Sequence, residues 1–109
     1  MTKNEISEKG FEIVALAGDA RSLYLKAIKL IKKREYEKAK MEISEANDIL
    51  KEAHQCQMDL LTEEGKGKYS DLTLIMAHGQ DHLMTAILLK ELLEIVFLDL
   101  YQDLHSIQK

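Results

Sequence analysis

Two histidines, an aspartate and a threonine lie close together in the C-terminal third of the chain. His78, Asp81, His82 and Thr85 follow one another at helical spacing. In an α-helix these positions share one face, and apolar residues continue that face in both directions. A buried polar group without a partner costs about 1–3 kcal/mol, so a polar cluster in an apolar stripe indicates a specific role.

Three kinds of chemistry suit this cluster. Histidine and aspartate at this spacing can share a metal ion, although the pattern differs from the His-Glu-x-x-His zinc motif. A histidine oriented by a carboxylate can act as a general acid or base, yet no serine or cysteine nucleophile lies nearby in the sequence. An imidazole can also be the nucleophile that carries a phosphoryl group. The structural alternative is a hydrogen-bonded His–Asp network that fixes the helix register.

The residues around the cluster and the other reactive side chains have simpler interpretations. Gly79 costs up to about 1 kcal/mol relative to alanine in a helix, and it is expected to open room beside His78. His54 is expected at the surface or a boundary, and His105 near the helix C-terminus to complement the helix dipole. Cys56 is expected to be a small buried or boundary side chain.

Composition limits the fold class and the compartment. The chain has 109 residues, no proline, five glycines and 46% hydrophobic residues, which predicts one all-helical domain over residues 1–109. The net charge of −4 disfavours nucleic acid as a partner, although Lys32, Lys33 and Arg34 form a short basic cluster. A single cysteine, a polar N-terminus and no sufficiently long apolar run predict a cytoplasmic protein without membrane insertion.

Apolar residues recur at helical spacing in three segments. The periodicity predicts helices over about residues 4–32, 35–64 and 70–106, with Ser70 as the N-cap of the last one. Tyr24, Tyr36 and Leu50 are core candidates. Helices of this length joined by short loops form a thin up-down-up hairpin. The predicted seam of the first two helices consists of Ile6, Gly10, Ile13, Ala17, Ala20, Tyr24, Ala27 and Ile31, and of Tyr36, Ala39, Ile43, Ala46, Leu50, Ala53, Gln57 and Leu60.

The third helix is apolar on most sides between Leu83 and Leu104, which two partner helices of a thin hairpin cannot cover. Self-association around a symmetry axis is the simplest solution. Copies of Asp81 would then face one another, and grouped carboxylates must protonate or bind a cation. Three such oxygens suit a hard divalent ion such as Mg²⁺, with waters completing its shell.

The segment His78-Gly79-Gln80-Asp81-His82-Leu83-Met84-Thr85 closely resembles the signature of the lactose/cellobiose-type enzyme IIA of the sugar phosphotransferase system. That family usually has alanine at the position of Gly79. The segment Ala17-Gly18-Asp19-Ala20-Arg21-Ser22 resembles its first-helix motif. Ala53-His54, with Gln57 and Leu60, resembles its second-helix motif, although Met58 stands where threonine is common. The similarity extends over nearly the whole chain.

The resemblance implies a homotrimer, a nine-helix bundle with one divalent metal ion, expected to be Mg²⁺, bound by three copies of Asp81. It implies that His78 accepts a phosphoryl group from the carrier protein HPr and passes it to a cysteine of the cognate IIB component. The phosphate finally reaches a sugar that crosses the membrane through IIC. In this family the phosphate is carried on Nε2. The sugar, whether lactose, cellobiose or a chitobiose-type disaccharide, cannot be read from this chain.

Within this scheme His82 is a candidate orienter or donor, and Gly79, Gln80 and Thr85 are candidate lining residues, although helix geometry turns Gln80 away from the His78 face. Two alternatives stay open at this point. One is a histidine phosphotransfer domain of a two-component relay, which is also helical and of similar size. The other is a non-enzymatic helical adaptor in which His78 and Asp81 belong to a structural network.

Overall fold

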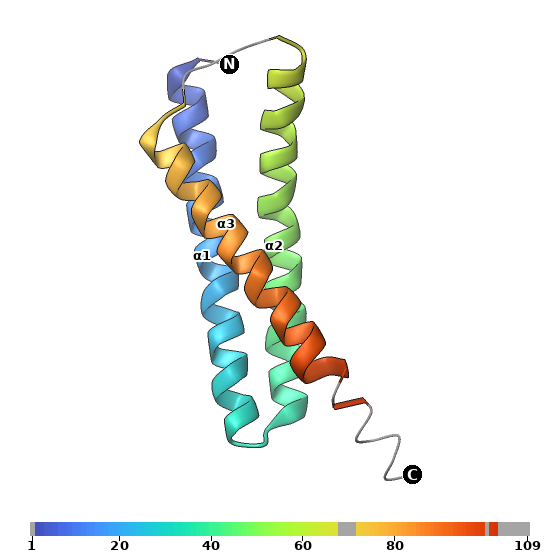
Figure 1. Cartoon of the computed structure of the whole chain (residues 1–109). Coiled ribbons are helices and arrows are strands. Elements are labelled where there is room, and N and C mark those ends of the chain that lie inside the picture. The colour runs from blue at the N-terminus through green and yellow to red at the C-terminus, as the bar shows by residue number, and fades with distance from the viewer. Residues whose placement is uncertain (1, 68–71, 100, 103–109) are drawn as a thin grey trace.

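Three helices make up the part of the chain that the computed structural model describes, residues 2–67, 72–99 and 101–102. Helix α1 covers Lys3–Lys32, α2 covers Tyr36–Gly65 and α3 covers Leu74–Leu93. A π-helical segment, η1, follows at Glu94–Asp99. No strand occurs within these ranges, and the predicted all-α hairpin of three helices is confirmed (Figure 1).

The molecule is a thin rod. Its principal extents are 56 × 22 × 16 Å, as expected for long helices joined by short loops. Helices α1 and α2 run antiparallel, and α3 crosses them diagonally from the N-terminal end of α1 towards the turn between α1 and α2 (Figure 1). Helix α3 packs mainly on α1. In the described residues, no helix is long and apolar enough to cross a membrane.

Local sequence explains where α1 begins and ends. Thr2 and Glu5 form a capping box, in which Glu5 N–H donates to Thr2 Oγ1 at 3.2 Å and Thr2 N–H donates to Glu5 Oε1 at 2.9 Å. At the other end, the Arg34 N–H donates to the Ile31 carbonyl and the Glu35 N–H to the Leu30 carbonyl. This pair of bonds is a Schellman motif, and it ends the helix.

The third helix differs from the sequence prediction at its start. It begins at Leu74, because Thr73 is its N-cap and accepts a hydrogen bond from Met76 N–H at 3.2 Å. The predicted N-cap, Ser70, lies outside the described residues. Regular α-helix ends at Leu93, where the wider turns of η1 follow, and the predicted end near residue 106 also lies outside them.

The core follows the predicted seams. Seven of the eight seam positions of α1 are buried and Ile31 is half-buried; in α2, Tyr36, Gln57 and Leu60 are half-buried and the remaining seam positions are buried. Tyr24 is fully buried, and its hydroxyl donates to Asn47 Oδ1 of α2 at 2.6 Å. This bond satisfies a polar atom that burial would otherwise leave without a partner.

Helices α1 and α3 approach most closely at two glycines. A Cβ added to Gly10 would lie 3.0 Å from the Cα and N of Met76. A Cβ added to Gly79 would lie 3.0 Å from the Gly10 carbonyl oxygen. The backbones can be this close only because neither residue has a side chain. The contact between Gly10 and Gly79 fixes the position of the histidine cluster along the axis of α1.

Candidate functional site

The two histidines of α3 contact each other directly. His78 is exposed and His82 is half-buried, one helical turn further along. Their Nε2 atoms lie 3.1 Å apart, and the rings meet edge to face at a centroid distance of 4.4 Å. A hydrogen bond at this distance requires that one Nε2 carries hydrogen and the other offers a lone pair.

The other ring nitrogen of His82 is enclosed. His82 Nδ1 is buried and has no hydrogen-bond partner among the described residues. Unpaired buried N–H groups are rare in proteins, because each costs the full desolvation of a donor. His82 is therefore held by packing on its Nδ1 side and by His78 on its Nε2 side.

Asp81 lies on the exposed face of α3. Its carboxylate has no hydrogen bond or ion pair with any other described residue, so the His–Asp network considered from the sequence is not found there. Apolar side chains continue the same face above and below it. Those at least 49% exposed are Leu74, Met84, Leu88, Leu92, Ile95 and Val96.

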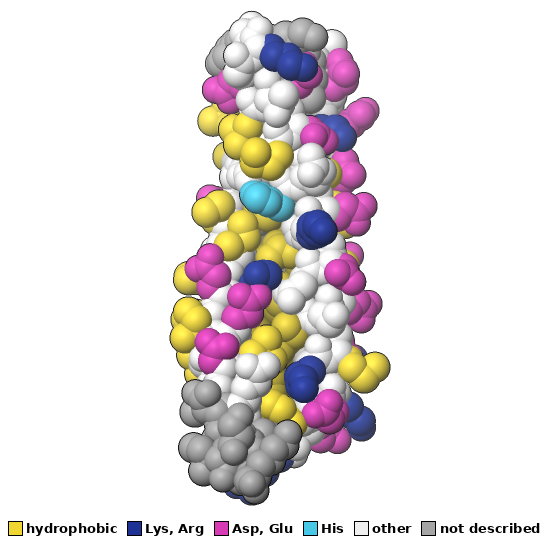
Figure 2. All heavy atoms as spheres, turned by 90° about the vertical axis from the view of Figure 1, so that its right-hand side faces the viewer, with side chains coloured by type: hydrophobic (Ala, Val, Ile, Leu, Met, Phe, Trp, Pro, Cys, Tyr) yellow, Lys and Arg dark blue, Asp and Glu magenta, His cyan; other side chains and the backbone are white. Residues whose placement is uncertain are grey.

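Exposed apolar surface is extensive on this rod. Figure 2 shows one side of the molecule, where hydrophobic side chains gather in a strip along the long axis between charged ones. Large contiguous apolar surfaces on a soluble chain mark contact sites. The exposed apolar side chains of α3 between Leu74 and Val96 give this helix the properties of an interface.

The three candidate lining residues point in other directions. Gly79 is buried, and its open Cβ position faces Gly10 and Ile13 of α1, so the room it leaves is not beside His78 as expected. Gln80 turns to α2, where its side-chain oxygen accepts a hydrogen bond from Gln57. This agrees with the prediction that Gln80 points away from the His78 face.

Thr85 is exposed, but its hydroxyl is already used. It donates within its own helix to the carbonyl oxygens of Asp81, at 3.0 Å, and His82, at 3.1 Å. Of the five residues proposed to accompany His78, only His82 contacts its ring within one chain. Gln57, which holds Gln80 against α2, was assigned from the sequence to the packing seam and to the second-helix motif, but not to the site.

The described residues of one chain do not form a complete metal site. Among the described residues, no group of three His, Cys, Asp or Glu side chains is placed to hold a metal ion. Asp81 supplies one carboxylate on an exposed face, a hard oxygen ligand of the kind that Mg²⁺ prefers. A metal ion at this position would need ligands from further chains.

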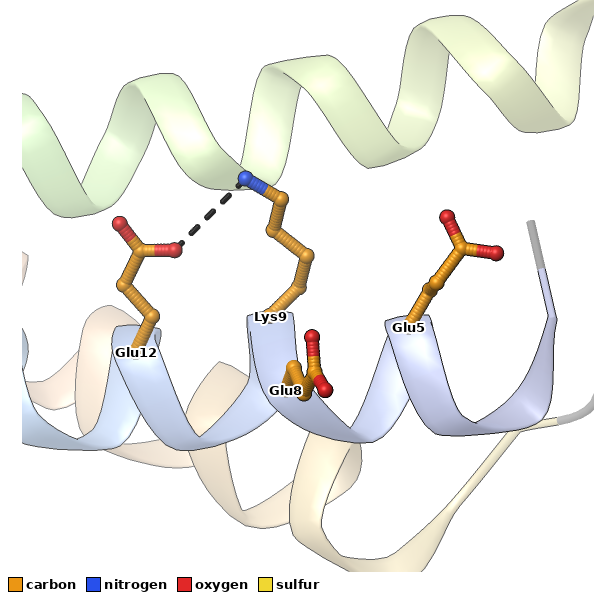
Figure 3. Close-up of a pocket in the computed structure, with 4 residues that line it drawn as sticks. All are labelled: Glu5, Glu8, Lys9 and Glu12. Carbon is orange, nitrogen blue, oxygen red and sulfur yellow. Dashed lines mark ion pairs between the residues drawn. The ribbon is translucent and has the colours of Figure 1, made fainter.

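A surface hollow near the N-terminus of α1 is separate from the histidines. It is lined by Glu5, Glu8, Lys9 and Glu12, and Lys9 pairs with Glu12 at 3.6 Å (Figure 3). All four residues come from α1, and none belongs to the predicted site. Because it is open and has no buried polar group directed into it, we assign it no function.

Two further reactive side chains, His54 and Cys56, match their simpler interpretations. His54 is exposed on α2, and Cys56 is buried. Burial, followed by the neighbouring Glu12 carboxylate, raises the pKa of the Cys56 thiol, which makes it a poor nucleophile. His105 lies outside the described residues.

Comparisons with known proteins identify relatives of this chain. The family model for the lactose/cellobiose-specific IIA subunit of the PTS system matches residues 8–102. The lactose-specific EIIA component of Staphylococcus epidermidis is 47% identical over 94 residues, which cover 86% of this chain and 90% of that protein.

Two solved structures extend the likeness to the fold. The crystal structure of PtcA from S. mutans matches with a TM-score of 0.86 and 40% identity, over 94% of this chain and 99% of that one. A chain of the solution structures of the IIA(chitobiose)–HPr complex from Escherichia coli matches with a TM-score of 0.72 and 29% identity. That match covers 92% of this chain and 96% of the other.

Proposed function

The chain belongs to the lactose/cellobiose-specific IIA subunit family of the PTS system, and we propose that His78 is its phosphoryl carrier. His78 would accept the group from phosphorylated HPr and pass it to a cysteine of the cognate IIB component during uptake of a β-linked disaccharide. The observation that carries the proposal is the exposed His78 ring, whose Nε2 lies 3.1 Å from His82 Nε2.

The burial of His82 favours one hydrogen arrangement. If His78 Nε2 carried the hydrogen, a neutral His82 would carry its own on Nδ1, as a buried donor without a partner. The arrangement of lower free energy has the hydrogen of His82 on Nε2, which then donates to His78 Nε2. The lone pair of His78 is thereby on Nε2, the exposed nitrogen that we propose as the nucleophile.

The transfer step then balances simply. The Nε2 lone pair of neutral His78 attacks phosphorus, the bond from phosphorus to the carrier's histidine nitrogen breaks, and that nitrogen keeps the electron pair. His78 retains its hydrogen on Nδ1. The His82 Nε2–H, released from the lone pair, would donate to an oxygen of the arriving phosphoryl group. Such a donor stabilises the charge that the group carries in the transition state.

HPr and IIB are the proposed partners. A structural relative of this chain is described in a complex with HPr, and similarity over nearly the full length supports the same partner here. His78 lies on a surface with exposed Met84 and Leu74 on the same helix, which offers apolar contacts around the reacting ring. IIC would act only indirectly, through IIB.

We also propose that the chain forms a homotrimer around α3. The exposed apolar stripe would be covered by copies of itself, and Asp81 lies in the middle of that stripe. Three Asp81 carboxylates facing one another would repel unless a cation separated them. A divalent ion, Mg²⁺ by ligand type, would bind there with one carboxylate from each chain. Its role would be to hold the assembly together.

The phosphoryl transfer is tested with phosphorylated HPr. The wild-type protein should gain one acid-labile phosphate per chain, and peptide mapping should place it on His78. His78→Ala should gain none. His54→Ala, which removes an exposed histidine from α2, should be phosphorylated at the wild-type rate. Phosphate on the His78→Ala protein, or its absence from wild type, would refute the assignment.

A further inference from the structure

The turn between α1 and α2 carries a concentration of positive charge. Residues 26–40 contain seven basic and two acidic side chains, whereas the whole chain has a net charge of −4. We call this end of the rod the basic tip (Figure 1). Its basic residues are Lys26, Lys29, Lys32, Lys33, Arg34, Lys38 and Lys40.

Three of these side chains are neutralised nearby. Lys26 pairs with Glu42 at 3.1 Å, Lys38 with Glu35 at 3.4 Å and Lys40 with Glu37 at 3.6 Å. The other four, which are all exposed, have no ion pair with any described residue. These are Lys29, Lys32, Lys33 and Arg34. The unpaired charge is therefore concentrated at the end of α1 and in the turn itself.

The backbone at Arg34 is unfavourable for arginine. Its φ is 61°, in the left-handed region, at the position of the Schellman motif where glycine is usual. A side chain there strains the backbone, because Cβ approaches the following carbonyl. Strain that the fold does not require is a reason to look for a role of the side chain. At this position the side chain adds a positive charge to the tip.

We propose that the basic tip binds the headgroup layer of a bilayer that contains anionic lipids. Clusters of four to eight basic residues bind such surfaces, and each residue near the surface contributes about fivefold in affinity. Because the charge is confined to one end of a rod 56 Å long, it fits a plane that is met end-on. A polyanion lying along the rod would meet the acidic flanks instead.

This orientation leaves His78 accessible. Gly10 packs on Met76, so the histidine pair lies level with the first half of α1. The basic tip is about 20 residues further along that helix, or about 30 Å at 1.5 Å per residue. Apart from the paired Glu35, Glu37 and Glu42, one carboxylate of the described residues opposes the binding: Asp99 of η1 is exposed, and the contact of Phe97 with Tyr36 places η1 beside this end. A single charge reduces the positive excess without reversing it.

Vesicle flotation tests the proposal. Wild-type protein should float with phosphatidylcholine vesicles that contain phosphatidylglycerol at low ionic strength, and should stay behind with pure phosphatidylcholine. Added salt should release it. Lys33→Gln combined with Arg34→Gly removes two charges and should weaken binding about 25-fold. Lys3→Gln combined with Lys51→Gln removes the same charge from exposed, unpaired positions elsewhere and should bind within about twofold of wild type.

Arg34→Gly alone separates binding from folding. Glycine relieves the left-handed strain, so this variant should melt at a higher temperature while it binds the anionic vesicles about fivefold more weakly. Equal losses in the tip and control variants would overturn the proposal, as would wild-type protein that does not distinguish the two vesicle types. Release by inorganic phosphate at constant ionic strength would indicate a phosphate site instead. Equally strong binding to polyglutamate would indicate an acidic protein partner.

Discussion

The chemistry at His78 depends on which ring nitrogens carry hydrogen. Among the described residues, His82 makes the only side-chain hydrogen bond and the only aromatic contact with the His78 ring, and its buried Nδ1 favours donation from Nε2. A hydrogen bond to a charged group contributes about 1.5–3 kcal/mol, which corresponds to roughly 10- to 100-fold in rate. In the proposed transfer, His82 would thus be a positioning residue before the step and a donor to the phosphoryl group during it.

His82→Ala should therefore slow phosphoryl transfer from HPr by roughly 10- to 100-fold while the phosphate still maps to His78. Rapid-quench measurement of phosphohistidine formation gives the rate. The His54→Ala protein serves as the control for loss of a histidine elsewhere. A wild-type rate in His82→Ala would show that the contact between the two rings has no part in the transfer.

Ionisation of the buried Tyr24 hydroxyl should make the free energy of unfolding depend on pH in the alkaline range. Burial, followed by the Glu94 carboxylate, raises the pKa of Tyr24 above its ordinary value of about 10. Below pH ~10 the phenol is neutral in both the folded and the unfolded chain. Above it the unfolded chain ionises first, so the free energy of unfolding falls as pH rises.

Tyr24→Phe should consequently behave differently at neutral and alkaline pH. At pH 7 it loses the 2.6 Å bond to Asn47 and should be less stable by about 0.5–1.5 kcal/mol. Above pH ~10 this difference should shrink, because phenylalanine cannot ionise and the variant escapes the alkaline loss. Urea unfolding of both proteins across this range measures it. A difference that stays constant with pH would mean that Tyr24 ionises alike in both states.

At the scale of helices, the packing of α1 on α3 depends on Gly10. It does not depend on Gly18, which lies in the same helix. Gly10→Ala should destabilise the protein by about 1–3 kcal/mol, because the new Cβ meets the Met76 backbone at 3.0 Å and the helices must separate. Gly18→Ala should stabilise it by up to about 1 kcal/mol, because no atom lies within 4 Å of that Cβ.

Chemical denaturation of the two variants tests this crossing of helices. Both substitutions remove a mid-helix glycine, so the gain in helix propensity is shared and the difference between them reports the contact alone. Similar stabilities would show that α1 and α3 can separate at this point without loss.

The helices could be predicted from sequence where one periodic pattern extends over the whole element. The seam of α1 predicted its core, since Gly10, Ala17 and Tyr24 recur at a spacing that only a helix satisfies. The start of α3 could not be predicted reliably, because Ser70 and Thr73 are both good N-cap residues and the choice depends on packing.

The candidate site likewise has features that spacing along the sequence predicts and features that depend on packing between helices. The shared face of His78, Asp81 and His82 follows from spacing alone and is present in α3. The direction of Gly79 depends on where α1 lies around α3, and a pattern along one helix contains no such information. For this reason the glycine was expected beside the imidazole, whereas it faces the neighbouring helix.

At the scale of the whole molecule, one chain leaves its third helix half covered. Buried residues of α3 such as Leu83 and Ala86 face the hairpin, while Leu88 and Leu92 on the other side are about half exposed. Exposed apolar area of this kind is stabilised by burial at about 25 cal/mol per Å². The carboxylate of Asp81 lies inside that area, so the proposed assembly gains from apolar burial and loses from charge repulsion unless a cation is bound.

Removing the metal ion should reverse the order of the melting temperatures of wild type and Asp81→Asn. With Mg²⁺ present, the proposed wild-type trimer should melt at a higher temperature than that of Asp81→Asn, because three carboxylates bind the ion more strongly than three amides. With EDTA the order should invert, since the variant avoids the repulsion among like charges. In a domain of this size, each kcal/mol corresponds to about 4–8 °C. Light scattering in both conditions gives the oligomeric state, and calorimetry gives the melting temperatures. Melting temperatures of wild type that EDTA leaves unchanged would exclude a metal ion as a stabiliser of the assembly.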